Sequence, residues 1–398
     1  MNVQCVIAGG GPAGMMLGLL LARAGIEVAV LEKHADFFRD FRGDTVHPST
    51  LRIMHELGLL QEFLRLPHSE FSELTGRFGD AQLRLVDFRH IPGPCKFIAM
   101  MPQWDLLNFL ADRASRYSGF HLLMQNEAVD LTRADGRVTG VVAQTPGGKT
   151  AIHADLVVAC DGRHSKMREC AQLPVTDIGA PIDVLWMRLS RRPGEPSGTF
   201  GNVAAGTIFV ALDRTTYYQC ALVIPKGALP QLQEQGLERL RERIAKAAPY
   251  LADRVNEIAS WNDLKLLTVR IDRLERWHLP GLLCIGDAAH AMSPIGGVGI
   301  NLAIQDAVAA ANATTGPLCS GAIDEAVLRR VQKRREFPTR ATQALQVFLQ
   351  ERFVSQVLSS NDSVRVPLAA RALDAVPTLR SIPAFIVGVG FRPEHVRS

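Results

Sequence analysis

Residues 3–33 read "VQCVIAGGGPAGMMLGLLLARAGIEVAVLEK", and this stretch contains the pattern that decides the fold. The apolar run 3–8 predicts a buried strand, the dense apolar residues of 13–24 predict a helix, and 27–31 predicts a second strand. A strand, a helix and a strand in this order form a βαβ unit, whose two strands lie parallel in one sheet. The sequence therefore predicts an α/β fold.

The turn between the first strand and the helix is rich in glycine. Gly9, Gly11 and Gly14 have the G-x-G-x-x-G spacing, which allows a tight turn, close approach of a pyrophosphate to the helix N-terminus, and close packing of helix on strand. Ala13 begins the helix beside the expected cofactor. Glu32 ends the second strand, where a carboxylate accepts hydrogen bonds from a ribose. The pattern predicts dinucleotide binding and leaves NAD and FAD both open.

Composition and charge narrow the class of protein. A chain of 398 residues is long enough for two cores, and 47% hydrophobic with 21% charged residues is typical of a soluble globular protein. A net charge of +4 does not favour a nucleic-acid or membrane partner. The seven scattered cysteines lack metal-ligand spacing and predict reduced thiols, a cytoplasmic location and no metal site. No apolar run reaches the ~20 residues that span a bilayer.

Four further motifs follow the glycine pattern along the chain. They are "FRGDTVHPSTL" at 41–51, "MPQWDLLNFLADRA" at 101–114, "ADLVVACDGRHSKMR" at 154–168, and "GLLCIGD" at 281–287. With these motifs in this order, the chain resembles the FAD-dependent aromatic hydroxylases, the single-component group A flavoprotein monooxygenases of the para-hydroxybenzoate hydroxylase type. The resemblance implies a Rossmann-like FAD-binding domain, a β-sheet substrate domain and C-terminal helices.

The resemblance also implies which residues contact FAD. Lys33 follows the second strand, the 42–47 loop wraps the flavin, Asp161 belongs to a motif associated with FAD and the nicotinamide donor, and Asp287 bonds the ribityl chain. The implied cofactor residues beyond the first βαβ unit are Lys33, Arg42, Gly43, Asp44, Thr45, Val46, His47, Gln103, Asp161, Asp287, Pro294, Gly297, Gly299, Ile300 and Asn301.

The small residues at 294–299 have a physical explanation in this setting. We expect the strand 281–287 to end at Asp287, and the glycines to let backbone pass along the isoalloxazine ring, where a β-carbon would collide. A helix is predicted to begin at Ile300. Its positive N-terminal end would stabilise an anionic reduced flavin.

The implied reaction is hydroxylation of a phenolic aromatic compound with NADH or NADPH and dioxygen, through a flavin C4a-hydroperoxide. His47 is a candidate for handling a phenolic proton, although it could equally pack against FAD without that duty. Candidate substrate contacts are Trp186, Arg188, Tyr217, Tyr218 and Pro294. The alternatives are a flavin-dependent halogenase, for which the Trp-x-Trp signature is missing, a reductase, or a non-catalytic flavin-binding module.

The motifs divide the chain into interleaved parts. We expect a discontinuous FAD-binding domain at 1–72, 101–180 and 271–340, a β-sheet substrate domain at 73–100 and 181–270, and a C-terminal helical region at 341–398. Turns are predicted at Asp135-Gly136 and Gly147-Gly148. An apolar stripe in the C-terminal region is consistent with core packing or a homodimer face; it comprises Phe348, Leu349, Phe353, Val354 and Val357.

Overall fold

The structure is a computed structural model of the full chain. It describes residues 1–38, 45–79, 81–195, 199–214, 216–360 and 366–397. Three of the predicted cofactor residues, Arg42, Gly43 and Asp44, lie outside the described residues.

The predicted βαβ unit is present. It consists of β1 (Asn2–Ala8), α1 (Pro12–Arg23) and β2 (Val28–Glu32), each within one residue of the expected bounds. The two strands are parallel, with Cys5 opposite Val28 and Ala8 opposite Leu31. Helix α1 forms because apolar side chains cover nearly its whole length, and residues 13–22 are all buried. The α/β fold predicted from this stretch is confirmed.

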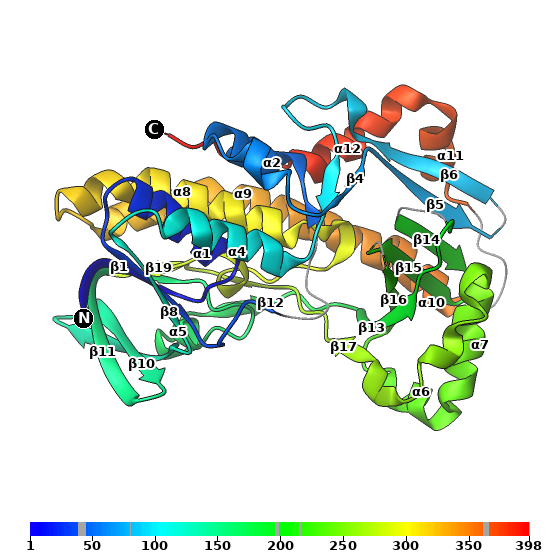
Figure 1. The fold of residues 1–398 in the computed structure, drawn as a ribbon, viewed down its shortest axis with the longest axis horizontal. Helices are drawn as coiled ribbons and strands as arrows, with labels where there is room; N and C mark the ends of the chain where they lie inside the picture. Colours follow the sequence, from blue (N-terminus) through cyan, green and yellow to red (C-terminus); the bar gives the residue numbers. More distant parts are fainter. Residues whose placement is uncertain (39–44, 80, 196–198, 215, 361–365, 398) are drawn as a thin grey trace.

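The βαβ unit belongs to a sheet of eight strands. The path of this sheet is β19 (His278–Leu279), β20 (Leu282–Cys284), β11 (Gly148–Ala159), β1, β2 and β8 (Phe120–Met124), with β9 (Glu127–Ala134) and β10 (Arg137–Thr145) pairing beyond β11. The predicted turns Asp135-Gly136 and Gly147-Gly148 join β9 to β10 and β10 to β11. Helices α1, α4 (Gln103–Ala114) and α8 (Gly299–Cys319) pack together on this sheet (Figure 1).

A second sheet of seven strands forms the other lobe. Its order is β17 (Lys265–Leu267), β13 (Ile182–Ser190), β16 (Tyr217–Pro225), β15 (Thr207–Asp213), β14 (Thr199–Ala204), β5 (Glu73–Phe78) and β6 (Ala81–Asp87). Strands from both predicted segments, 73–100 and 181–270, therefore meet in one sheet. One face is covered by α7 (Leu237–Ala247), because Leu240, Ile244 and Ala247 recur at helical spacing and are buried.

The C-terminal part begins with a helix that crosses a predicted boundary. Helix α9 (Glu325–Leu349) continues past the division expected between residues 340 and 341, and it lies beside α8 (Figure 1). It passes into a π-helical turn, η7 (Gln350–Val354), which changes the helical phase. The predicted apolar stripe is therefore split, with Val354 and Val357 buried and Phe348 exposed.

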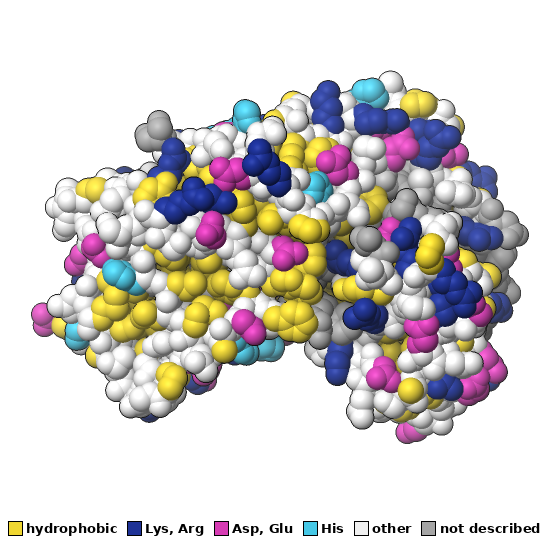
Figure 2. Space-filling model, in the orientation of Figure 1, with side chains coloured by type: hydrophobic (Ala, Val, Ile, Leu, Met, Phe, Trp, Pro, Cys, Tyr) yellow, Lys and Arg dark blue, Asp and Glu magenta, His cyan; other side chains and the backbone are white. Residues whose placement is uncertain are grey.

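Three more helices complete the described chain. They are α10 (Ser355–Ser359), α11 (Leu368–Ala375) and α12 (Ser381–Gly388). Positive and negative side chains are interspersed on the face drawn in Figure 2, as the small net charge of +4 leads one to expect. Over the described part of the chain, no helix combines the length and apolar character required to cross a membrane.

Candidate active site

The motifs meet at one edge of the eight-stranded sheet. Strands β1, β11 and β20 are mutually parallel neighbours, so their carboxyl ends lie together. The chain leaves β1 through Gly9, leaves β11 through Cys160, and leaves β20 through Ile285. Backbone hydrogen bonds from Cys160 N to Ala8 O and from Ile285 N to Ala159 O, 2.7 and 3.0 Å, hold these exits in register.

The glycines at this edge differ in what surrounds them. A β-carbon on Gly9 would lie 2.4 Å from the Cys160 carbonyl oxygen, and one on Gly14 would lie 2.0 Å from the Gly9 carbonyl oxygen. A β-carbon on Gly11 would meet no described atom within 4 Å. The first two glycines are thus required by the protein's own packing, whereas Gly11 faces open space at the N-terminus of α1, as a bound pyrophosphate requires.

Glu32 lies at the end of β2 and supports the glycine turn. Its two carboxylate oxygens accept hydrogen bonds from Gly10 N, at 3.2 Å, and His34 N, at 3.0 Å. A carboxylate at this position is of the type that accepts hydrogen bonds from a ribose. Lys33 is exposed and lies 3.9 Å from the Glu127 carboxylate. Gln103 is the first residue of α4 and is half-buried.

Asn301 joins the described end of the 42–47 loop to the start of α8. Its side-chain oxygen accepts hydrogen bonds from His47 N, at 2.9 Å, and Thr50 Oγ1, at 2.7 Å, while its amide donates to Thr45 O at 3.2 Å. Thr45 Oγ1 donates to Gly297 O at 2.8 Å, and a β-carbon on Gly297 would clash with that hydroxyl at 2.3 Å. Gly299 has open space at its α-carbon. Thr45, Gly297 and Asn301, three of the predicted cofactor residues, thus lie in contact with one another.

His47 is completely buried, and its ring is held by the C-terminal region. Nδ1 lies 2.8 Å from the Val387 carbonyl of α12, which fixes the proton on that nitrogen. Nε2 is buried and has no hydrogen-bond partner among the described residues. Burial lowers the pKa of His47 from its ordinary value of 6.5 to about 4, although the Val387 bond raises it somewhat. A neutral, enclosed ring supports the packing alternative over proton transfer.

Asp287 is displaced from the position predicted for it. Strand β20 ends at Cys284, and Asp287 lies in a short 3-10 turn, η5 (Gly286–Ala288), because Gly286 has a φ of +60° that breaks the strand. The carboxylate is about one-third exposed and lies 3.7 Å from the Arg163 guanidinium. It therefore remains available at the edge where the motifs meet.

The Asp161 motif is fixed by capping and by a buried ion pair. Asp161 accepts hydrogen bonds from Ser165 Oγ, at 2.5 Å, and Met167 N, at 3.0 Å, and its burial raises the pKa of the carboxyl. Arg168 forms a two-pronged contact with Asp272, with N–O distances of 3.3 and 3.1 Å. These contacts orient the turn that follows β11, so the motif has a structural function in this chain.

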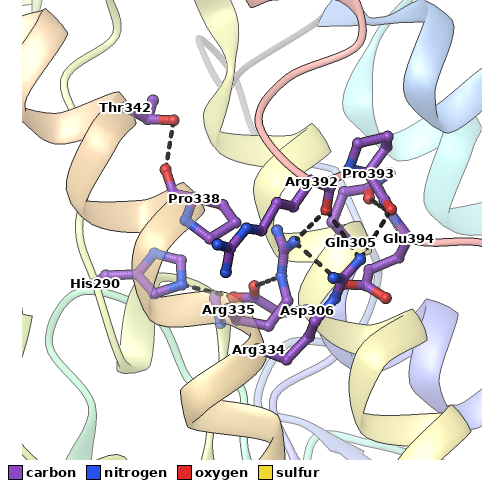
Figure 3. Close-up of polar contacts among 11 residues, drawn as sticks. His290, Gln305, Asp306, Arg334, Arg335, Pro338, Thr342, Arg392, Pro393 and Glu394 are labelled. Atoms are coloured by element: carbon purple, nitrogen blue, oxygen red, sulfur yellow. Dashed lines mark hydrogen bonds and ion pairs between the residues drawn. The ribbon is translucent and has the colours of Figure 1, made fainter.

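A buried ionic network, drawn in Figure 3, packs against the turn η5 that contains Asp287. Asp306 of α8 accepts hydrogen bonds from Gly286 N, at 3.1 Å, His290 Nε2, at 2.6 Å, and Arg335 Nε, at 2.8 Å. Burial alone would raise the pKa of Asp306, but the His290 ring and the Arg335 guanidinium outweigh that effect and lower it. Arg335 also contacts Glu394 from the C-terminal tail, at 3.4 Å. The turn is thus anchored by charge-assisted hydrogen bonds.

The sequence alone did not reveal this network. Asp306 is the only charged residue in the run "NLAIQDAVAA" at 301–310, and an isolated acid in a helix rich in apolar residues is a signal of a buried, paired carboxylate. Its partners could not be identified in the same way, because Arg335 and Glu394 come from segments distant in the chain.

The predicted substrate contacts of the second lobe lie on opposite faces of the seven-stranded sheet. Trp186, Arg188 and Tyr217 share one face, and the Arg188 guanidinium lies 4.0 Å from the centre of the Tyr217 ring. Tyr218 points to the opposite face, where it is fully buried beneath α7 among Leu189 and Cys220. Alternation along β16 forces neighbouring residues to opposite faces, so Tyr217 and Tyr218 cannot both line one pocket.

The family of the chain follows from comparison with known proteins. The model of the family described as "FAD binding domain" matches residues 2–345. A curated relative, 6-methylpretetramide 4-monooxygenase of Streptomyces rimosus, is 33% identical over 380 residues, which are 95% of this chain and 90% of the relative. The chain belongs to the group A flavoprotein monooxygenases. Three other curated relatives are longer, and the matches cover 54–64% of their length.

Solved structures share the fold of this monooxygenase. PqsL, a probable FAD-dependent monooxygenase from Pseudomonas aeruginosa, has a TM-score of 0.76 and 21% identity, over 90% of this chain and 97% of that one. CmlS, a flavin-dependent halogenase, has a TM-score of 0.73 and 18% identity, over 98% of this chain and 74% of that one. The fold is thus common to hydroxylating and halogenating flavoproteins and does not distinguish between them.

The described residues of the monooxygenase fit an FAD cofactor. The open space at Gly11 and the carboxylate of Glu32 at the end of β2 suit the adenosine and pyrophosphate half, while Asp287, Gly299 and the amides opening α8 suit the flavin half. FAD, when bound, supplies the redox chemistry. These residues would hold the cofactor at the edge where the motifs meet.

The difference between the glycines can be tested through FAD binding. In Gly11→Ala the new methyl group meets no atom of the described residues within 4 Å, so the apoprotein should keep its thermal stability, but FAD affinity should fall by about 1 to 3 kcal/mol, or roughly 5- to 150-fold in Kd. Fluorescence titration of the apoprotein with FAD measures this loss. The remote Gly316→Ala serves as control, and unchanged affinity in Gly11→Ala would show that the pyrophosphate lies elsewhere.

The buried state of His47 predicts a pH dependence of stability. Since its folded pKa of about 4 lies below the ordinary 6.5, the unfolded chain binds the proton first as pH falls through this window. Protonation of His47 in the unfolded chain should therefore reduce the free energy of unfolding by about 1.4 kcal/mol for each unit by which the pH falls between 6.5 and about 4. In urea unfolding, the His47→Gln variant should lack this pH dependence of the free energy of unfolding. The His55→Gln variant should retain it, because His55 is exposed on α2 (Pro48–Glu56). Parallel curves for His47→Gln and wild type would contradict the buried, neutral ring.

Proposed function

We propose that this enzyme uses NADH or NADPH with dioxygen to hydroxylate a phenolic aromatic compound. The observation that supports the proposal best is the relative at 33% identity over 95% of the chain, a monooxygenase, combined with a described site that fits FAD. The second lobe supports it further, because its sheet offers Trp186, Arg188 and Tyr217 on one face. An aromatic ring, a cation and a phenol suit a planar, acidic aromatic substrate.

A basic groove beside the Asp161 motif supports the use of a nicotinamide donor. Arg163, His164 and Arg270 line it together with the capped turn that begins α5 (Lys166–Cys170). The pKa of His164 is lowered by burial and then by the nearby Arg163 and Arg270 guanidinium groups. Such a positive groove favours the phosphate groups of a dinucleotide. Its charge suits NADH and NADPH alike.

The same scaffold admits other activities, which differ in measurable ways. A halogenase requires chloride or bromide, a reductase turns over without dioxygen, and a non-catalytic flavin-binding module oxidises no NAD(P)H. The missing Trp-x-Trp signature disfavours halogenation, since no other tryptophan lies two residues from Trp104, Trp186, Trp261 or Trp277.

Isotopically labelled dioxygen tests the proposed reaction. Phenolic compounds, including 6-methylpretetramide from the relative's name, are first screened for stimulation of NAD(P)H oxidation. With the best compound, one labelled oxygen atom should appear in the product, and a poor fit should release peroxide because water reaches the flavin. Label entering from water, halide-dependent products, or turnover without dioxygen would overturn the proposal.

The groove generates a second prediction, on Arg270. In Arg270→Gln one charge-assisted contact of about 1.5 kcal/mol is lost, so the KM for NAD(P)H should rise roughly tenfold while FAD content stays unchanged. Lys149→Gln is the control, because Lys149 is an exposed cation of β11 that does not line the groove. If the KM for NAD(P)H does not change in Arg270→Gln, the donor binds elsewhere.

A further inference from the structure

The turn at Pro294 is held by one side chain of α9. Gln346 accepts a hydrogen bond from Ser293 N at 3.1 Å, and its amide donates to Ser293 O at 3.0 Å and Ile295 O at 2.9 Å. Three hydrogen bonds from one buried amide fix the backbone on both sides of Pro294. The side chain thus acts as a clamp on the segment that leads into the glycines 296, 297 and 299.

Neighbouring polar residues of α9 hold the same segment. Gln343 donates to Ala291 O at 3.0 Å, and Gln350 donates to Ser293 Oγ at 2.6 Å. Residues 343, 346 and 350 lie on one face of a helix, three or four positions apart. Arg335 of the ionic network in Figure 3 belongs to the same buried row. Helix α9 and Gln350, the first residue of η7, therefore hold residues 291–295 directly through polar side chains. Arg335 is linked to Gly286 only through Asp306.

The same helix continues onto the sheet lobe. Beyond Gln350 the π-helical turn η7 places the Phe353 ring 5.9 Å from the Phe78 ring of β5. Val354 and Val357 are buried against Val184 of β13. Ile295 packs against this cluster, to which Trp186 also belongs. The Pro294 turn thus lies where the cofactor edge, α9 and the proposed substrate face come together.

We propose that Gln346 is a positioning residue that sets the Pro294 turn between the flavin edge and the sheet lobe, so that NAD(P)H oxidation stays coupled to hydroxylation. The proposal rests on the proposed function. An apolar side chain of similar size would fill the same volume but would leave the Ser293 and Ile295 backbone groups without their partner. A loosened turn admits water to the site, and small misplacement of a reacting group is costly in rate.

The test compares Gln346→Leu with Gln356→Leu, the same substitution at an exposed position of α10. With the best substrate, the ratio of product formed to NAD(P)H consumed should fall about tenfold in Gln346→Leu and remain at the wild-type value in the control. Amide hydrogen exchange of the apoproteins should also become faster over residues 291–297 in Gln346→Leu, since backbone hydrogen bonds are lost. Wild-type coupling together with wild-type exchange would overturn the role of Gln346.

A second variant keeps the test decisive if Gln346→Leu does not fold. Gln346→Glu retains size and one acceptor, but its carboxylate would face the Ser293 and Ile295 carbonyls; protonation restores one donor. Because burial raises the pKa of a carboxyl at this position, coupling relative to wild type should improve as pH falls from about 8 to about 5, and a ratio independent of pH over this range would contradict the clamp. If the wild-type enzyme forms no hydroxylated product with any compound, the proposed function itself fails. The hydrogen-exchange measurement still tests whether Gln346 holds the Pro294 turn.

Discussion

The steric constraint at Gly9 and Gly14 underlies the rest of the molecule. Backbone from β1, β11 and α1 approaches so closely there that a side chain on either glycine would overlap a carbonyl oxygen. This contact sets the distance between strand and helix, and it leaves the helix N-terminus open at Gly11. Parallel strands then bring Cys160 and Ile285 to the same edge, so that motifs separated by more than a hundred residues share one site.

Buried polar contacts then fix the loops that leave this edge. Asp306 bonds the Gly286 amide and is itself balanced by Arg335, while Asp272 balances Arg168 beneath the Asp161 turn. Removing one partner of such a pair would leave an uncompensated buried charge, which is strongly destabilising. The network therefore determines where Asp287 lies, although none of these side chains needs to contact the cofactor.

Helix α9 connects the edge where the motifs meet to the second sheet. Its middle holds the Asp306 network through Arg335, its C-terminal end clamps the Pro294 turn through Gln346, and its continuation packs on the second sheet. A single rigid helix with three such attachments keeps the two lobes in a fixed relation. His47 adds a further tie, because its ring joins the N-terminal loop to α12 through the Val387 carbonyl.

The sequence by itself determined the βαβ unit, the glycine roles and the four-motif resemblance, because these depend on local periodicity and on residue types that few other structures require. The family comparison confirmed that assignment. The sequence alone could not show which face of β16 is covered by α7, and hence that Tyr218 is buried. It also could not show that β20 ends before Asp287, since a single positive φ at Gly286 ends the strand. The sequence alone also could not show that Asp306 pairs with Arg335, or Gln346 with Ser293. Such contacts join residues far apart in the chain, and only tertiary packing selects one partner from the many that local chemistry allows.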